Sequence, residues 1–324
     1  MFQVEPILWL QSLESPGITW VMKTTSLLGY AHVYALLLIV LIFGVRFKQS
    51  IFVFLTILIC GILTDGLKDG LMFPRPSDVD ARVIEPGYER PPLLIDGGGA
   101  ESFWSLPSPE AMEVSRNQTD WSYGLPSGHV GLAAAFFLGL AFFYRSKGVF
   151  TFAVFWVLLM ALSRMYLGRH FIADVLGGVI VGLFCVFLAA FLVRHLIAEN
   201  PRNSEVSSLI RWAVFATILL VLTPFIDLLD KEDVGRIWGL LLTYVVLLKT
   251  GFPLDKGSFV KRLGRVLLAV AFFILIDQII NPIIDSMAME DNSFGMLFTV
   301  FLTTCIPFVA IVFLARKLKL YAVK

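Results

Sequence analysis

Long apolar runs recur along the chain and are separated by shorter polar segments. A helix that crosses a bilayer needs about 17–25 apolar residues. The shortest run, 235–249, also fits a tilted or re-entrant segment. The pattern predicts an all-α polytopic membrane protein with about nine transmembrane helices. The nine runs are 27–45, 50–73, 128–144, 148–166, 171–193, 211–229, 235–249, 264–284 and 294–315.

Two segments depart from this pattern. Residues 1–26 alternate apolar and polar positions around the break Ser15-Pro16-Gly17, which predicts an interfacial amphipathic segment of one or two short helices. Residues 77–123 link the second and third runs and are rich in Pro, Gly, Ser and acidic residues. A loop of this length is usually either functional or disordered.

Composition supports a membrane protein and excludes several other classes. Hydrophobic residues make up 57% of the chain, charged residues 16%, and the mean hydropathy is +0.81, whereas soluble domains are about 45–50% apolar and about 25% charged. A soluble enzyme, a secreted disulfide scaffold and a disordered chain are therefore excluded. Cys60, Cys185 and Cys305 lie singly in apolar runs, so neither disulfides nor a metal site is expected.

The distribution of charge predicts the orientation. The net charge of +1 is not concentrated in a basic surface, so no nucleic-acid partner is expected. Sixteen of the 26 Lys and Arg residues lie on one side of the predicted spans, in loops 46–49, 145–147, 194–211 and 249–265 and in tail 316–324. The positive-inside rule makes this side cytoplasmic, with the C-terminus inside and the N-terminus outside.

Lys68 and Arg75 form the first of three charged clusters on the expected outer side. They are seven residues apart at the end of the second run, so we expect them two helical turns apart on one face. Pro74 and Pro76 should end that helix. Charged side chains at the edge of a bilayer are costly unless they meet an anion, so this pair indicates an anion site.

The second cluster is Leu125-Pro126-Ser127-Gly128-His129, which opens the third run. Free backbone N–H groups at a helix N-terminus and the Ser127 hydroxyl suit a phosphate group, and Gly128 lets a ligand approach the backbone. His129 follows one residue inside the helix, where it can exchange a proton with that ligand.

The third cluster lies between Ser163 and Asp174. His170 and Asp174 are four residues apart, so on a helix the carboxylate can hold one ring nitrogen and leave the other as a nucleophile. Gly168 permits a turn that returns Arg164 to the same place. Three cations, a helix N-terminus, a hydroxyl and two histidines are typical of phosphoryl transfer through a phosphohistidine, with fixed charges replacing a metal.

Together these clusters resemble the signature of the type-2 phosphatidic acid phosphatase superfamily. The matching patterns are Lys-x6-Arg-Pro, Pro-Ser-Gly-His and Ser-Arg-x5-His-x3-Asp, and the resemblance covers about residues 27–195. It implies that His170 attacks phosphorus, His129 protonates the leaving alcohol and Asp174 orients His170. It implies no metal and no cofactor. The residues implied to hold the phosphoryl oxygens are Lys68, Arg75, Ser127, Gly128 and Arg164.

The resemblance divides the chain beyond its interfacial segment 1–26. Residues 27–200 are expected to form a phosphatase-type helical core that includes the outer loop 77–123, and residues 201–324 to add four spans. The resemblance says nothing of these spans, and we expect them to supply packing, homodimer contacts or a wall that selects lipid tails. Asp277, Gln278 and Asn281 lie inside one of them, where we favour a helix-to-helix contact over a transport pathway.

The expected function is hydrolysis of a lipid phosphate or lipid diphosphate at the outer or luminal face, with the bilayer and the phosphorylated lipid as partners. Soluble haloperoxidases of the superfamily are disfavoured, and the identity of the lipid stays open. Other hypotheses are a phosphotransferase, a sugar-phosphate phosphatase, and a transporter or flippase with an accessory phosphatase site. Arg169 could either form a structural ion pair or bind substrate, and Gly178 and Gly182 indicate close helix packing.

Overall fold

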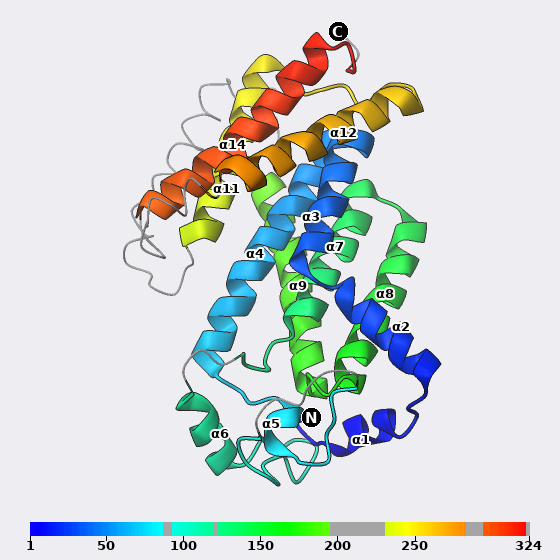
Figure 1. Cartoon of the computed structure of the whole chain (residues 1–324), viewed down its shortest axis with the longest axis vertical. Coiled ribbons are helices and arrows are strands. Elements are labelled where there is room, and N and C mark those ends of the chain that lie inside the picture. Colours follow the sequence, from blue (N-terminus) through cyan, green and yellow to red (C-terminus); the bar gives the residue numbers. More distant parts are fainter. Residues whose placement is uncertain (87–92, 119–121, 195–230, 281, 283–293, 322–324) are drawn as a thin grey trace. The chain divides into compact units, whose positions relative to one another are not determined.

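The computed structural model describes residues 1–86, 93–118, 122–194, 231–280, 282 and 294–321. These residues form helices joined by loops, with no strand among them (Figure 1). Three short helices, α1, α5 and α6, lie close to the N-terminus. The helices are α1 Glu5–Gln11, α2 Pro16–Leu27, α3 Ala31–Val40, η1 Leu41–Val45, α4 Phe47–Leu71, α5 Pro76–Val79, α6 Pro109–Arg116, α7 Gly128–Tyr144, α8 Lys147–Tyr166, α9 Ile172–Leu192, α11 Lys231–Thr250, α12 Phe259–Leu275, η4 Ile276–Ile280 and α14 Phe294–Lys317.

Several helices are apolar enough to cross a membrane, which confirms a multi-pass integral membrane protein. Four segments reach spanning length among the described residues, Phe47–Val79, Lys147–Tyr166, Ile172–Leu192 and Gly295–Lys317. Helix α2 and the α3–η1 pair form a fifth only if their bend of 65° lies within one span, and α7 is a shorter apolar helix. The predicted count of nine is not established, and run 211–229 lies outside the described residues.

The described residues form two compact units, and neither is a continuous piece of chain. The first unit comprises Met1–Tyr34 and Ile59–Phe187, and the second comprises Ala35–Leu58 and Leu188–Lys324. Helix α4 therefore contributes to the second unit up to Leu58 and to the first from Ile59 onward. The division at residue 200 that the sequence suggests stays a prediction.

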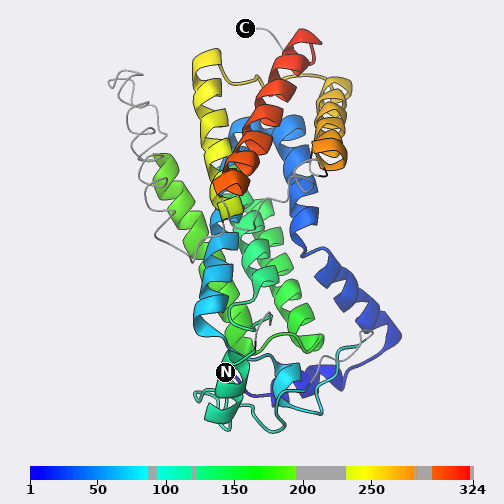
Figure 2. The ribbon, with the colours of Figure 1, turned by 60° about the vertical axis from the view of Figure 1, so that its left-hand side comes forward.

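The N-terminal residues and the outer loop build a small hydrophobic core at one end of the first unit (Figure 2). The Phe2 ring stacks on Phe73 with centroids 5.0 Å apart and meets Phe171 edge-on at 5.7 Å. The described parts of the loop are thus packed rather than free. We call this cluster the outer cap; its buried members are Phe2, Val4, Ile7, Phe73, Val79, Val83, Ala100, Ala111, Met112 and Phe171.

Helices α7 and α9 approach closely because glycines line their contact, as the sequence predicts. A Cβ atom on Gly182 would lie 2.5 Å from Ala134 Cβ and 2.8 Å from the Gly131 carbonyl oxygen. A Cβ atom on Gly178 would lie 2.6 Å from the Ser127 carbonyl oxygen. Small residues allow such backbone contact, which also fixes the start of α7 against α9.

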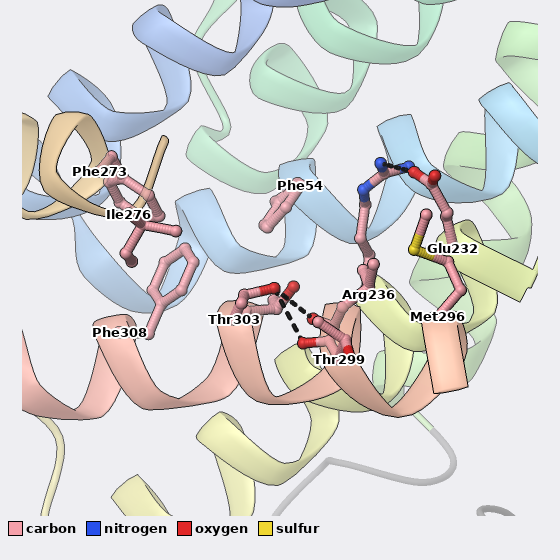
Figure 3. Close-up of a pocket in the computed structure, with 11 residues that line it drawn as sticks. Phe54, Glu232, Arg236, Phe273, Ile276, Met296, Thr299, Thr303 and Phe308 are labelled. Atoms are coloured by element: carbon pink, nitrogen blue, oxygen red, sulfur yellow. Dashed lines mark hydrogen bonds and ion pairs between the residues drawn. The ribbon is translucent and has the colours of Figure 1, made fainter. Parts of the chain in front are cut away.

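The second unit contains a cavity of about 430 Å³ between α4, α11, α12, η4 and α14 (Figure 3). Arg236 enters this cavity already paired with Glu232 and with Asp233. The Thr303 hydroxyl donates to the carbonyl oxygens of Thr299 and Val300. The lining thus combines apolar side chains with threonines and an ion pair. Its residues are Phe54, Glu232, Arg236, Phe273, Ile276, Met296, Thr299, Val300, Thr303, Thr304 and Phe308.

The polar residues predicted inside the eighth run are only partly described. Gln278 is exposed on the π-helix η4, while the side chain of Asp277 and the whole of Asn281 lie outside the described residues. Their role in a helix contact stays a prediction.

Gly182→Ala should destabilise the first unit, because the added methyl group meets backbone and side-chain atoms of α7. We expect a loss of about 1–3 kcal/mol, typical of overpacking. Thermal unfolding in detergent, followed by tryptophan fluorescence, measures it. Gly148→Ala is the matched control, since nothing lies within 4 Å of its Cβ position. Equal melting temperatures for the two variants would contradict the proposed close packing.

Candidate active site

The first motif lies where α4 leaves the membrane region, but its two cations do not share a helix face. Helix α4 ends at Leu71, Met72 adopts the left-handed conformation with φ of 53°, and Arg75 is extended at the N-cap of α5. The expectation of one continuous helix from Lys68 to Arg75 is therefore wrong. Pro74 and Pro76 explain this, because proline ends a helix earlier than the spacing alone suggests.

Arg75 is buried and is held by the segment that leads into the second motif. Its Nε donates to the Ser122 carbonyl oxygen and its Nη2 to Ser122 Oγ, both at 2.6 Å. Its backbone N–H donates to Asp78 Oδ2 at 2.7 Å. These contacts fix the guanidinium beside the start of α7.

The second motif forms the N-terminus of α7, as predicted. Ser127 is the N-cap residue, is fully buried, and its hydroxyl has no hydrogen-bond partner among the described residues. A Cβ atom on Gly128 would lie 3.9 Å from Lys68 Nζ, which places this ammonium beside the free N–H groups of the helix. The Tyr30 ring meets His129 edge-on at 4.8 Å, a contact that the motif does not predict.

The third motif forms the turn between α8 and α9. Gly168 has φ of +69°, so the turn adopts a conformation that favours glycine. His170 precedes α9, which begins at Ile172, so the expected pairing of His170 and Asp174 along one helix is wrong in detail. The pair still meets, with His170 Nδ1 3.4 Å from Asp174 Oδ2, because the Phe171 N–H donates to the same carboxylate oxygen at 2.9 Å.

The cations of the first and third motifs act on His170. Burial is the main reason why the pKa of His170 lies well below its usual value of 6.5. Arg164, Arg75 and Lys68 lower it further by charge repulsion, and His129 adds to this. The imidazole is thus neutral near pH 7, the form in which it is a nucleophile.

Several buried polar atoms at this place lack hydrogen-bond partners within the described residues. They are Ser127 Oγ, His129 Nε2, Arg164 Nε, His170 Nδ1 and Asp174 Oδ1. Buried polar groups are normally satisfied. Their gathering around one point, among the cations, fits a site that takes a polar, anionic ligand.

A second network of buried polar side chains, which the sequence does not reveal, lies next to the site. It links Arg169 to Glu85 and Ser77 of the loop 77–123 region. Arg169 Nη2 lies 2.6 Å from Glu85 Oε2, and Ser77 Oγ donates to Glu85 Oε1 at 3.2 Å. Burial raises the pKa of Glu85, while Arg169 opposes that change most strongly. The sequence leaves open whether Arg169 forms an ion pair or binds substrate, and the structure shows an ion pair with Glu85.

Gln11 joins this network to the membrane helices. Its side-chain amide donates to the carbonyl oxygens of Ile84, at 2.7 Å, and Tyr166, at 2.9 Å, and its Oε1 accepts from the Ile84 N–H at 3.2 Å. A polar residue within the apolar periodicity of 1–26 is the only sequence signal for it. Among the described residues, no group of three His, Cys, Asp or Glu side chains could hold a metal ion.

The fold and the candidate site define a multi-pass membrane protein with a buried cluster of cations and histidines. Residues 49–198 match the PAP2 superfamily, and this part of the chain belongs to that superfamily. The resemblance given by the three motifs is thereby confirmed, since the matched range contains all of them. No solved structure matches the chain.

Two curated proteins are similar to part of the chain. Phosphatidylglycerophosphatase B of Bacillus subtilis is 38% identical over 76 residues, which cover 21% of this chain and 37% of that protein. Lipid A 4'-phosphatase of Bacteroides thetaiotaomicron is 25% identical over 100 residues, covering 31% and 44%. The chain thus spans less than half of the length of each of these relatives.

The lowered pKa of His170 predicts that acid destabilises the folded protein. Between this pKa and 6.5, the unfolded chain binds a proton at His170 and the folded chain does not, so stability falls as pH falls below 6.5. From pH 7.5 to 5.5 the loss should be about 1.4 kcal/mol for this group. Melting temperatures of the wild type and His170→Gln across this range measure it, with exposed His32→Gln as the control. An equal pH dependence in all three would contradict the assignment.

Proposed function

We propose that this protein is a membrane phosphatase that hydrolyses a lipid phosphate or lipid diphosphate through a phosphohistidine, without a metal ion. The observation that carries the proposal is the meeting of Lys68, Arg75 and Arg164 around buried, neutral His170. The names of the two similar proteins, both lipid phosphatases, point to the same substrate class.

The position of Asp174 supports different roles for the two ring nitrogens of His170. Nδ1 faces the Asp174 carboxylate at 3.4 Å, so Nε2 is the atom that attacks phosphorus. The bond between phosphorus and the leaving oxygen breaks as the bond to Nε2 forms, and His129 gives the leaving oxygen a proton. Water then attacks the phosphohistidine and gives a proton to His129 as it does so, which releases inorganic phosphate and restores both His170 and the protonated His129.

The remaining residues stabilise charge during both steps. Lys68, Arg75 and Arg164 face the phosphoryl oxygens, and the N–H groups at the start of α7 and the Ser127 hydroxyl donate to them. Gly128 leaves room for the phosphoryl group to reach these N–H groups. Because these donors are fixed by packing before the substrate arrives, they need little rearrangement in the transition state.

His170→Ala and His129→Ala should fail in different ways when assayed in EDTA. Without His170 no phosphoenzyme forms on any substrate. Without His129, turnover of an alkyl phosphate should fall about 10²–10⁴-fold, but p-nitrophenyl phosphate should be affected less because its leaving group needs no proton. Radiolabelled phosphoenzyme trapping and phosphate release measure this, and His32→Ala is the control. A phosphohistidine retained by His170→Ala would show that the roles are wrong, and dependence on added Mg²⁺ would refute metal independence.

We further propose that the active site faces the outer or luminal side and that the C-terminus is cytoplasmic. The native cysteines are buried, so introduced cysteines can report topology. Trp104→Cys, in the exposed outer loop, should react with a membrane-impermeant maleimide in intact cells. Lys317→Cys, at the end of α14, should react only after permeabilisation. The reverse labelling pattern would invert the proposed orientation.

A further inference from the structure

Arg169 is a fourth cation in the catalytic cluster, next to the proposed nucleophile in sequence. Its charge acts on Arg75, Arg164 and His129, and its backbone N–H donates to the Arg164 carbonyl oxygen at 3.0 Å. Its side chain is 29% exposed, whereas Arg75 and Arg164 are almost fully buried. Arg169 is therefore placed to meet an anion at the more open side of the cluster.

Glu85 already forms an ion pair with Arg169. Its side chain is completely buried, ion-paired with Arg169 at 2.6 Å, and accepts a hydrogen bond from Ser77. Its charge also acts on Arg75 and Arg164, so this carboxylate lies within the anion site's own field. A buried carboxylate here attracts the cations and repels any second anion that approaches them.

The segment that carries Glu85 is fixed against the catalytic turn. Gln11 bonds to both the N–H and the carbonyl oxygen of Ile84 and also to Tyr166 at the end of α8. A Cβ atom on Gly168 would lie only 2.6 Å from the Ile84 carbonyl oxygen, so the loop rests directly on the turn. Moving Glu85 aside would break these bonds, so it acts as a permanent counter-ion.

We infer that Glu85 is a specificity-determining residue, which withdraws Arg169 from substrate binding and favours a lipid monophosphate over a lipid diphosphate. The inference rests on the proposed function and narrows its substrate class. One phosphoryl group meets the charges of Lys68, Arg75 and Arg164, which act together on His170. A second phosphate group would need a fourth cation and would instead meet an arginine already neutralised and a buried carboxylate.

Glu85→Gln tests the inference, because glutamine keeps the side chain's shape and its acceptor for Ser77 but removes the charge. The assay compares kcat/KM for farnesyl diphosphate and farnesyl monophosphate, which share one hydrocarbon chain. The wild type should prefer the monophosphate. Glu85→Gln should raise the relative kcat/KM for the diphosphate on the order of tenfold, as expected for one released charge near a surface.

Two further variants make the test specific. Glu101→Gln removes an exposed acid from the same loop and should leave the ratio unchanged. Glu85→Gln combined with Arg169→Gln should lose the gain, because the released cation is gone, and this closes a double-mutant cycle. A Glu85→Gln ratio equal to that of Glu101→Gln would overturn the inference. The inference would also be overturned if the wild type had equal kcat/KM for the diphosphate and the monophosphate. This comparison holds even if Glu85→Gln fails to fold.

A binding measurement separates this inference from the proposed function. Methylenediphosphonate, which cannot be hydrolysed, should bind Glu85→Gln about tenfold more tightly than the wild type in calorimetry, while inorganic phosphate should gain clearly less because it does not reach Arg169. Absence of phosphate release from either lipid would refute the phosphatase proposal and leave this result standing. Unchanged affinity for methylenediphosphonate would refute the role of Glu85 whatever the turnover.

Discussion

The site depends on one buried carboxylate, that of Asp174. Its Oδ2 accepts the Phe171 N–H and faces His170, while its backbone carbonyl oxygen accepts the Ser127 N–H at 2.9 Å. One residue thus joins the turn that carries His170 to the helix N-terminus that carries Ser127 and Gly128. A carboxyl group with no exposed surface is tolerated only among partners of this kind, so these contacts hold both segments in place.

The helical architecture could be predicted from the hydrophobic runs because a bilayer allows few other backbone structures. A backbone within hydrocarbon must bond to itself, so long apolar runs become helices, as α8, α9 and α14 do. The exact ends were harder to predict, since they depend on local stereochemistry. Met72 in the left-handed conformation ends α4 before Arg75. The bend of 65° between α2 and α3, in contrast, lies close to the predicted boundary between segment 1–26 and run 27–45.

The candidate site residues could be found in the sequence because phosphoryl transfer calls for particular side chains, and these lie at short spacings within each motif. The roles of Glu85 and Gln11 could not be predicted, because their partners are distant in the sequence. Glu85 pairs with Arg169, 84 residues away, and Gln11 bonds to Ile84, 73 residues away. Only folding of the outer loop onto the N-terminal residues brings them into contact. The loop's composition suggested function or disorder, whereas the cap core around Phe2 and Phe171 shows that its described parts carry their own packing.

The interleaving of the two units limits how the protein can be divided. The second unit takes Ala35–Leu58 from within the sequence of the first, and α4 belongs to both. Leu188–Lys324 therefore shares a unit with Ala35–Leu58, of which only residues 49–58 lie in the matched range 49–198. A gene fragment limited to the matched residues would lose most of both pieces of this unit, so the matched range is not a separable folding unit and the C-terminal region would be inherited or exchanged only together with the N-terminal helices.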